Sequence, residues 1–349
     1  MKNILFYKYI DTGNPEALKK EQFKLAKSLN LLGTILIAKE GINGCLSGNE
    51  KDLEQYKKAL EKNKKFSDIK FKEGSANKHT FRKLHVRIRD EIVSSRFSAD
   101  LKNKGKYIEP KQFKKLLDNN EDVVLLDARN NYEFEIGKFT NAIHLDLDTF
   151  REFPLKIKKL QGKNNNNNQN DIKNKSNNKN SINNLKNNNL VNNNKNFNKK
   201  IKNNIDENEK IIKNINSLKN KKIITYCTGG VRCEKASALL KENGFENVYQ
   251  LHGGILAYGK ECGNAHWHGK CFVFDTRGAI DIDPNSQSEP ITQCVLCHLP
   301  NAELHNCALT SCDRFFTACG GCFEVLERCC SKRCRNEILS CVVKNNIQN

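Results

Sequence analysis

Residues 226–233 read YCTGGVRC, and this segment carries the residue types best suited to catalysis. An apolar run typical of a buried strand precedes it and a segment with helical spacing follows, so Cys227 is expected at a helix N-terminus. Backbone N–H groups and the charge of Arg232 would there lower the pKa of the thiol and bind anionic sulfur or oxygen. We therefore predict that Cys227 and Arg232 are catalytic. The active-site loop between them consists of Thr228, Gly229, Gly230 and Val231, and its glycines allow the backbone to curl around the sulfur. A structural cysteine beside a glycine turn is the alternative.

Eight further cysteines near the carboxyl end have the spacing of metal ligands. They form four pairs: Cys294 and Cys297, Cys307 and Cys312, Cys319 and Cys322, and Cys330 (or its neighbour Cys329) and Cys334. Eight thiolates suit two tetrahedral Zn²⁺ sites, because each structural zinc binds four soft ligands. Residues 266–341 are therefore predicted to form a Cys-rich module with two structural zinc ions. The spacing leaves open which cysteines share an ion; interleaved pairs would place Cys294, Cys297, Cys319 and Cys322 together. A disulfide cluster is the alternative.

The elements that must position the cysteine loop form an α/β pattern over residues 107–265. Apolar runs predict strands at 122–126, 142–145, 222–226 and 248–251, and helical spacing predicts helices at 110–119, 132–136, 150–160 and 234–243. Strands that alternate with helices imply a parallel sheet with a ligand site at its carboxyl edge.

Residues 1–95 have a different order of elements. Strands are predicted at 4–9, 34–38, 45–47, 69–72 and 83–89, with helices at 14–31 and 51–60. The first four of these strands and the two helices follow the order βαββαβ, which fits a ferredoxin-like α+β sandwich, a fold that often binds RNA or another domain.

An Asn/Lys-rich tract at 163–220 interrupts the α/β pattern. Of its 58 residues, 26 are Asn and 12 are Lys, and few are aromatic. Such a composition buries too little apolar surface to order itself, so we expect a disordered surface insertion. A long loop costs little when its ends are close, and deletion of 164–219 is expected to leave folding and activity nearly unchanged.

The α/β region resembles a rhodanese domain. The active-site loop of rhodaneses has Arg five positions after Cys, as Cys227 and Arg232 have here. A segment of the form Asp-x-Arg-x-x-x-Glu…Gly is matched by Asp127, Arg129, Glu133 and Gly137, and the closing turn of the family is matched by LHGGI at 251–255. Related phosphatases use a loop one residue longer, so this loop disfavours phosphatase activity. In rhodaneses the cysteine carries a persulfide, which the resemblance implies for Cys227.

A closer resemblance covers residues 4 to 334 apart from the Asn/Lys tract. AKEGING at 38–44, CTGGVRCEKAS at 227–237 and GKCFVFD at 269–275 are similar to the bacterial-type tRNA uridine(34) hydroxylases. This implies an α/β rhodanese domain, an N-terminal ferredoxin-like (acylphosphatase-like) domain and a C-terminal Cys-rich module. It also implies 5-hydroxylation of the wobble uridine of tRNA, with molecular oxygen as co-substrate. The sequence identifies no oxygen-activating cofactor; His144-Leu145-Asp146 has only the His-x-Asp spacing of half an iron site.

Basic residues suggest where tRNA would bind. The chain has a formal net charge of +19, which favours a polyanionic partner, although lysine-rich drift would give the same charge. The candidate phosphate contacts are Lys78, Arg82, Lys83, Arg87 and Arg89. A solvated strand face is the alternative.

Three functions remain open from the sequence: a tRNA-modifying oxygenase, a persulfide sulfurtransferase that passes sulfur to a thiol or carrier, and a non-catalytic zinc-bearing RNA-binding protein. No apolar run is long enough to cross a membrane, and the first ten residues have no secretory signal. A cytoplasmic protein without a membrane partner is expected. The oligomeric state is left undecided.

Overall fold

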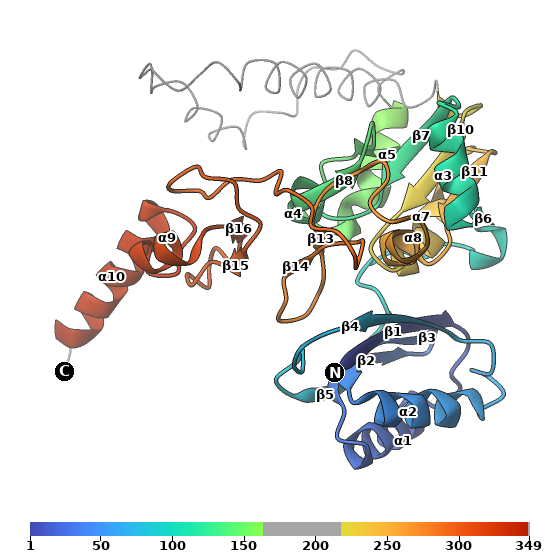
Figure 1. Ribbon diagram of the computed structural model, residues 1–349, viewed down its shortest axis with the longest axis horizontal. Coiled ribbons are helices and arrows are strands. Elements are labelled where there is room, and N and C mark those ends of the chain that lie inside the picture. Colours follow the sequence, from blue (N-terminus) through green and yellow to red (C-terminus); the bar gives the residue numbers. More distant parts are fainter. Residues whose placement is uncertain (163–217, 348–349) are drawn as a thin grey trace.

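The structure is a computed structural model, and it describes residues 1–162 and 218–347 (Figure 1). The Asn/Lys tract, apart from its last three residues, lies outside the described residues.

The amino-terminal part is a five-stranded sheet with two helices on one face (Figure 1). Its elements are β1 (Lys2–Tyr9), α1 (Pro15–Ser28), β2 (Leu32–Ala38), β3 (Gly41–Gly48), α2 (Glu50–Glu61), β4 (Lys70–Ser75) and β5 (Leu84–Ile88). The strand order is β4-β1-β3-β2-β5; β5 pairs parallel to β2 and the other pairs are antiparallel. The predicted ferredoxin-like fold is therefore confirmed, with one added edge strand. Phe6, Ile35 and Tyr56 lie in the core between the sheet and the helices.

The second part is a parallel α/β sheet. Its elements are β6 (Lys106–Ile108), α3 (Pro110–Asp118), β7 (Val123–Asp127), α4 (Asn131–Ile136), β8 (Gly137–Phe139), β9 (Ile143–His144), α5 (Phe153–Gly162), β10 (Lys222–Tyr226), α7 (Val231–Glu242), β11 (Val248–Leu251) and α8 (Gly254–Cys262), with short 3-10 turns at Leu101–Asn103 and Phe150–Glu152. The sheet order is β6-β11-β10-β7-β9, all parallel, so β10 is central. The helix expected at 234–243 begins at Val231, which places Arg232 and Cys233 in its first turn.

The carboxyl-terminal part begins with β12 (Trp267–Gly269), which pairs antiparallel with β8. It continues with β13 (Cys271–Phe272), β14 (Ala279–Ile280), β15 (Leu304–Asn306), β16 (Phe315–Thr317), α9 (Gly320–Val325) and α10 (Lys332–Ile347). The helix α10 was not predicted, because its cysteine spacing dominates the sequence pattern of that segment. None of the described helices is long and apolar enough to cross a membrane.

The two ends of the Asn/Lys tract meet the same turn. The Gln161 side chain donates to the carbonyl of Asn243 at 2.8 Å, and Lys219 lies beside Gly244. Leu218, which the sequence pattern assigns to the tract, is only 8% exposed and packs in the core of the α/β sheet. The folded domain therefore resumes at Leu218, before the predicted end of the insertion at 220.

Deleting residues 165–214 and joining the ends with a short Gly/Ser linker is expected to leave the melting temperature within about 2 °C of the parent, because both ends lie at one turn. A deletion that extends through Leu218, such as the 164–219 deletion that the sequence pattern suggested, should instead be clearly less stable, since it removes a core side chain worth about 2–5 kcal/mol. Thermal denaturation of the two deletions measures the difference. Equal stability of both would contradict the placement of Leu218.

Candidate active site

Cys227 lies directly after the central strand β10, at the carboxyl edge of the parallel sheet. The side chain is buried, and its Sγ accepts the backbone N–H of Gly230 at 3.1 Å. The helix α7 begins at Val231, directly after Gly230, so the free N–H groups of its first turn face the sulfur. The loop therefore has the geometry that stabilises an anionic sulfur.

The surroundings of Cys227 favour the thiolate. Burial alone would raise its pKa, but a hydrogen bond from the Cys233 thiol, the charge of Arg232 and the N–H groups of Arg232 and Gly230 lower the pKa from 9.0 to about 6. Burial, followed by the hydrogen bond to Cys227, raises the pKa of Cys233. Cys233 therefore stays protonated and donates to Cys227, a role that the sequence alone did not reveal.

This pKa predicts a pH dependence. Cys227 is expected to be a thiolate above about pH 6 and a thiol below it, so the ultraviolet thiolate absorbance that disappears in Cys227→Ser should titrate with a midpoint near 6. Subtracting the absorbance titration of Cys227→Ser from that of the wild type removes the contribution of the other cysteines. A midpoint near the ordinary thiol value of about 8.5 would contradict the stabilisation by the loop.

The two loop glycines are required for the approach of the amino-terminal sheet. Gly230 has φ +97°, and a Cβ there would lie 3.0 Å from the Tyr7 hydroxyl. A Cβ on Gly229 would lie 2.6 Å from a methyl group of Leu5. The glycines therefore allow β1 to pack on the loop, in addition to the curvature around the sulfur that the sequence predicts.

Arg232 is held by a buried carboxylate on a neighbouring element. Glu133, in the first turn of α4, accepts from the Arg232 guanidinium at 2.5 and 2.8 Å, and both side chains are buried. Glu133 also accepts the backbone N–H of Asn130 at 3.1 Å in a capping box and the Thr228 hydroxyl at 3.3 Å. A bidentate pair of this kind fixes the guanidinium beside the thiol.

The amino-terminal sheet docks on the first turn of α7 with the face that carries no helix. The Tyr7 hydroxyl donates to Glu234 at 3.1 Å, the Tyr9 hydroxyl donates to the carbonyl of Val231 at 3.3 Å, and Lys235 pairs with Glu40 at 3.0 Å. The pattern of short motifs along the chain gave no signal of these contacts, because they join residues more than 190 positions apart.

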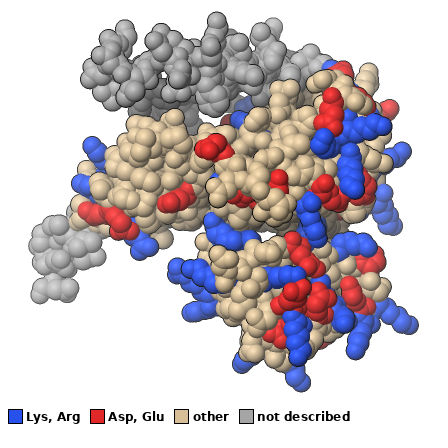
Figure 2. Space-filling model, in the orientation of Figure 1, with Lys and Arg blue, Asp and Glu red and all other residues tan. Residues whose placement is uncertain are grey.

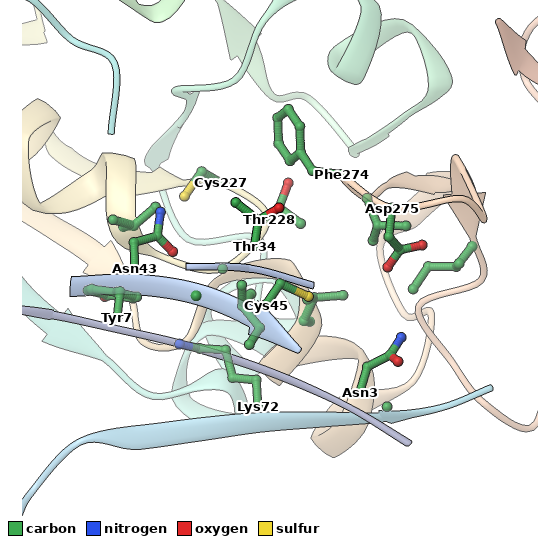
Figure 3. A pocket seen from close by; sticks show the side chains of 18 of the residues that line it. Asn3, Tyr7, Thr34, Asn43, Cys45, Lys72, Cys227, Thr228, Phe274 and Asp275 are labelled. Carbon is green, nitrogen blue, oxygen red and sulfur yellow. The ribbon is translucent and has the colours of Figure 1, made fainter. Parts of the chain in front are cut away.

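A cavity of about 1110 Å³ lies between this sheet face, the cysteine loop and the segment after β13 (Figure 3). Cys227 and Thr228 line it from one side, and Asn43, Cys45 and Lys72 line it from the sheet. Register explains the sheet side: Leu5 pairs with both Cys45 and Lys72, so these three side chains share one face. The carboxyl edge of the parallel sheet therefore faces an interdomain cavity.

Lys72 is a charged group of this cavity that the sequence analysis missed. Its Nζ lies 4.7 Å from the centre of the Tyr7 ring. Burial lowers the pKa of Lys72 to about 8, against the opposing effects of Cys227 and Glu234. Its β4 strand carries no motif, so only the folded structure associates Lys72 with the cysteine.

The predicted phosphate contacts are all exposed but are only partly gathered. Arg87 pairs in register with Leu36, which pairs with Asn43, so Arg87 shares the cavity face of the sheet. Lys83 and Arg89 lie directly before and after β5, each an even number of positions from Arg87, so they follow the same strand alternation as Arg87. Lys78 and Arg82 lie in the connection between β4 and β5. Figure 2 shows many basic side chains on the amino-terminal part, interspersed with acidic ones.

The carboxyl-terminal cysteines form two groups of four. Cys294, Cys297, Cys319 and Cys322 are one group, and Cys307, Cys312, Cys330 and Cys334 are the other; within each, all sulfurs lie within 4.8 Å of one another. The grouping is the interleaved one. The Sγ–Sγ distances are 3.8 Å for Cys297–Cys319 and 3.7 Å for Cys312–Cys330. These match the edge of about 3.8 Å of a tetrahedron with metal–sulfur bonds of about 2.3 Å, and exceed the disulfide length of about 2.05 Å. The clusters can therefore hold metal ions.

His144 does not offer a free metal ligand. Its Nε2 contacts the carbonyl of Arg129 at 2.7 Å, and its Nδ1 lies 3.1 Å from the backbone nitrogen of Asp146. Both ring nitrogens are therefore used in the structure of the loop, and the His-x-Asp spacing has a local structural cause.

The fold and the cysteine loop define a rhodanese-domain protein. Residues 109–261 match the family model described as Rhodanese-like domain, residues 1–92 match the UPF0176 acylphosphatase like domain, and residues 268–335 match Rhodanase C-terminal.

Curated relatives extend this likeness over the whole chain. A protein named tRNA uridine(34) hydroxylase from Cytophaga hutchinsonii is 36% identical over 334 residues, which cover 95% of this chain and 89% of that protein. Proteins of the same name from Chlamydia felis and Bacillus licheniformis are 34% and 36% identical and cover 95% and 80% of this chain, and 86% and 71% of their own lengths. The chain belongs to the tRNA uridine(34) hydroxylase family, as the sequence motifs predicted.

Proposed function

We propose that this protein hydroxylates C5 of the wobble uridine, position 34 of tRNA, with Cys227 as the reacting thiolate and molecular oxygen as co-substrate. One oxygen atom enters the new C–O bond, and the other leaves as water with two electrons from an external reductant. One observation carries the proposal: a thiol held as a thiolate opens into an interdomain cavity of about 1110 Å³. A pocket of this size accommodates a nucleotide that is still joined to its neighbours. A tRNA substrate agrees with the cytoplasmic location expected from the sequence.

The residues around Cys227 have distinct tasks in this proposal. Arg232 and the N–H groups at the start of α7 stabilise negative charge on the sulfur or on a group bound to it. Glu133 orients Arg232 and is itself held by Asn130. The active-site loop between Cys227 and Arg232 consists of Thr228, Gly229, Gly230 and Val231. The helix-free face of the amino-terminal sheet forms the opposite wall of the cavity.

We assign tRNA phosphate contacts to Arg87 and Arg89, with Lys83, Lys78 and Arg82 further along the same segment. Substituting Arg87→Gln together with Arg89→Gln is expected to weaken tRNA binding and to reduce the slope of log affinity against log salt by about 1.5. Lys20→Gln with Lys24→Gln, two exposed charges on α1 on the other side of the sheet, is the matched control. Equal slopes for both pairs would argue against this track.

We assign the two four-cysteine groups to structural zinc. Four thiolates close the coordination shell of each ion, whereas a catalytic zinc keeps a position for water. The zinc ions would hold β15, β16, α9 and the start of α10 together, because this segment has a small apolar core of its own. They would supply no group to the reaction at Cys227.

The decisive experiment is mass spectrometry of nucleosides from tRNA of cells with and without the gene. Loss of 5-hydroxyuridine and its derivatives at position 34, restored by the wild-type chain and not by Cys227→Ser, is the expected result. Unchanged tRNA modification after deletion would overturn the proposal.

A second candidate function is persulfide transfer. The six-residue span from Cys227 to Arg232 forms a cradle of N–H groups that suits a transferable sulfur. Thiosulfate:cyanide turnover would not separate the two functions, because a good loop of this type supports it in either case. The second candidate would be favoured if the protein transfers labelled sulfur to a physiological thiol or carrier and if deletion of its gene leaves tRNA modification unchanged.

A further inference from the structure

Phe274 is an aromatic side chain left open at the wall of the cavity. It is 64% exposed, although phenylalanine is ordinarily buried, and it lines the same space as Cys227 and Thr228 (Figure 3). It belongs to the segment GKCFVFD at 269–275, to which the proposed chemistry gives no role. An exposed apolar ring that lines the same cavity as Cys227 can provide a contact surface for a ligand.

The backbone and neighbours of Phe274 hold its ring in place. It follows β13, whose hairpin with β14 is closed by a hydrogen bond from the Val273 N–H to the carbonyl of Gly278 at 2.8 Å. The ring meets the Phe272 ring edge-on, with centroids 4.8 Å apart and planes at 85°. The guanidinium carbon of Arg232 lies 5.9 Å from the ring centre. The ring is therefore positioned directly beside the arginine of the cysteine loop.

The other walls of the cavity supply groups that match a nucleotide. Amide and hydroxyl side chains come from the sheet, among them Asn43 and Thr34. The Asn43 Nδ2 donates to the carbonyl of Ile92 at 2.9 Å, and its Oδ1 accepts no hydrogen bond from any residue that the structure describes. Basic side chains, Arg151 and Lys260, stand at the same cavity. A flat apolar ring, amide groups and cations together suit a base and its phosphates better than an uncharged apolar ligand.

We propose that Phe274 is the platform on which the target pyrimidine stacks after it has left the anticodon stack. The inference rests on the proposed function and names the residue that receives the base. Unpaired RNA bases are commonly bound by stacking on aromatic side chains, and the binding is tolerant of Tyr in place of Phe because both offer a π-face. Phe274 is a positioning residue here: it orients the base and takes no part in the reaction at the sulfur.

Photocrosslinking tests this directly. An anticodon stem–loop RNA with 5-bromouridine at position 34 is bound to the full-length protein and irradiated, and the crosslinked peptide is identified by mass spectrometry. The expected crosslink is at Phe274, and it should be lost in Phe274→Ala and Phe274→Leu and kept in Phe274→Tyr. A crosslink at another residue, or one that persists in Phe274→Leu, would overturn the proposal.

Kinetics and binding give the second readout. The ratio kcat/KM for hydroxylation should fall roughly five- to 150-fold in Phe274→Ala, as expected for the loss of one base-stacking contact, and Phe274→Tyr should restore it. Phe23→Ala removes an exposed aromatic ring on α1, away from the cavity, and should leave kcat/KM unchanged. If the wild-type protein binds and hydroxylates RNA and Phe274→Ala does so equally well, only the stacking proposal fails. If the wild-type protein neither binds nor hydroxylates RNA, the proposed function fails, and the stacking proposal with it.

Discussion

Replacing Cys227 by serine is expected to abolish tRNA hydroxylation, with a loss of at least about a thousandfold, while the fold stays intact. The serine hydroxyl is nearly isosteric with the thiol and can still accept the N–H of Gly230. It will not ionise near neutral pH, whereas the surroundings of Cys227 lower the thiol pKa to about 6. Nucleoside mass spectrometry of tRNA from a complemented deletion strain measures the effect.

The matched control for this substitution is Cys262→Ser. Cys262 lies in the last turn of α8, outside the cavity, and burial raises the pKa of its thiol, so it is expected to remain an unreactive thiol. Cys262→Ser should therefore retain wild-type activity. Melting curves of both variants within about 2 °C of the wild type would establish that the loss in Cys227→Ser is chemical. Wild-type hydroxylation by Cys227→Ser would rule out the thiolate as the reacting group.

Purified protein is expected to contain about two zinc ions per chain, and Cys294→Ser combined with Cys297→Ser should reduce this to about one. The substitutions remove two of the four sulfurs in one group and leave the other group complete. Since the apolar core of the module is small, the affected segment should become the first site of limited proteolysis. Elemental analysis and mapping of the cleavage sites give the two measurements.

Two single substitutions separate the cysteines that are neighbours in sequence. Cys330 belongs to a four-sulfur group, whereas Cys329 is buried and belongs to neither. Cys330→Ser should therefore lower the zinc content, and Cys329→Ser should leave it at about two. A metal content near zero in the wild type, with the cysteines paired as disulfides, would replace the zinc sites with a disulfide cluster.

The Cys-rich module is also joined to the elements around the cysteine loop by aromatic contacts. Phe315, on β16, lies 4.4 Å from the Tyr132 ring and 5.7 Å from the Phe272 ring, measured between ring centres. Tyr132 precedes Glu133, which holds Arg232. Loss of metal is therefore expected to lower activity partly through the position of Arg232, in addition to any effect on tRNA binding.

Local patterns in the sequence were sufficient for most elements of the two larger sheets and for the cysteine loop. The alternation of apolar strands and helical segments predicted both sheets, and the glycines and arginine around Cys227 predicted a loop at a helix N-terminus. These features depend on residues that are close in sequence. The pairing of Glu133 with Arg232 was not predicted, because 99 positions separate the two residues and no local pattern connects them.

The cavity and its walls could not be predicted from the same patterns. Lys72, Asn43 and Phe274 come from the edge strand β4, the strand β3 and the segment after β13. Asn43 and Phe274 lie in segments that carry the family resemblance, but no local pattern assigned a chemical role to any of the three residues. Their proximity depends on the docking of one sheet face on α7. Only tertiary packing determines that arrangement, so a sequence pattern with a short period contains no information about it.

The cysteine loop and the Asn/Lys tract lie at opposite ends of the central strand β10. Its carboxyl end leads into Cys227, whereas its amino end lies just after the point where the chain returns from the Asn/Lys tract. The extra length therefore joins the domain at the edge of the sheet away from the thiol. In evolutionary terms, the amino edge can gain or lose sequence without altering the reacting groups. In practical terms, it offers a position for an affinity tag or a fluorophore that reports on the enzyme at work.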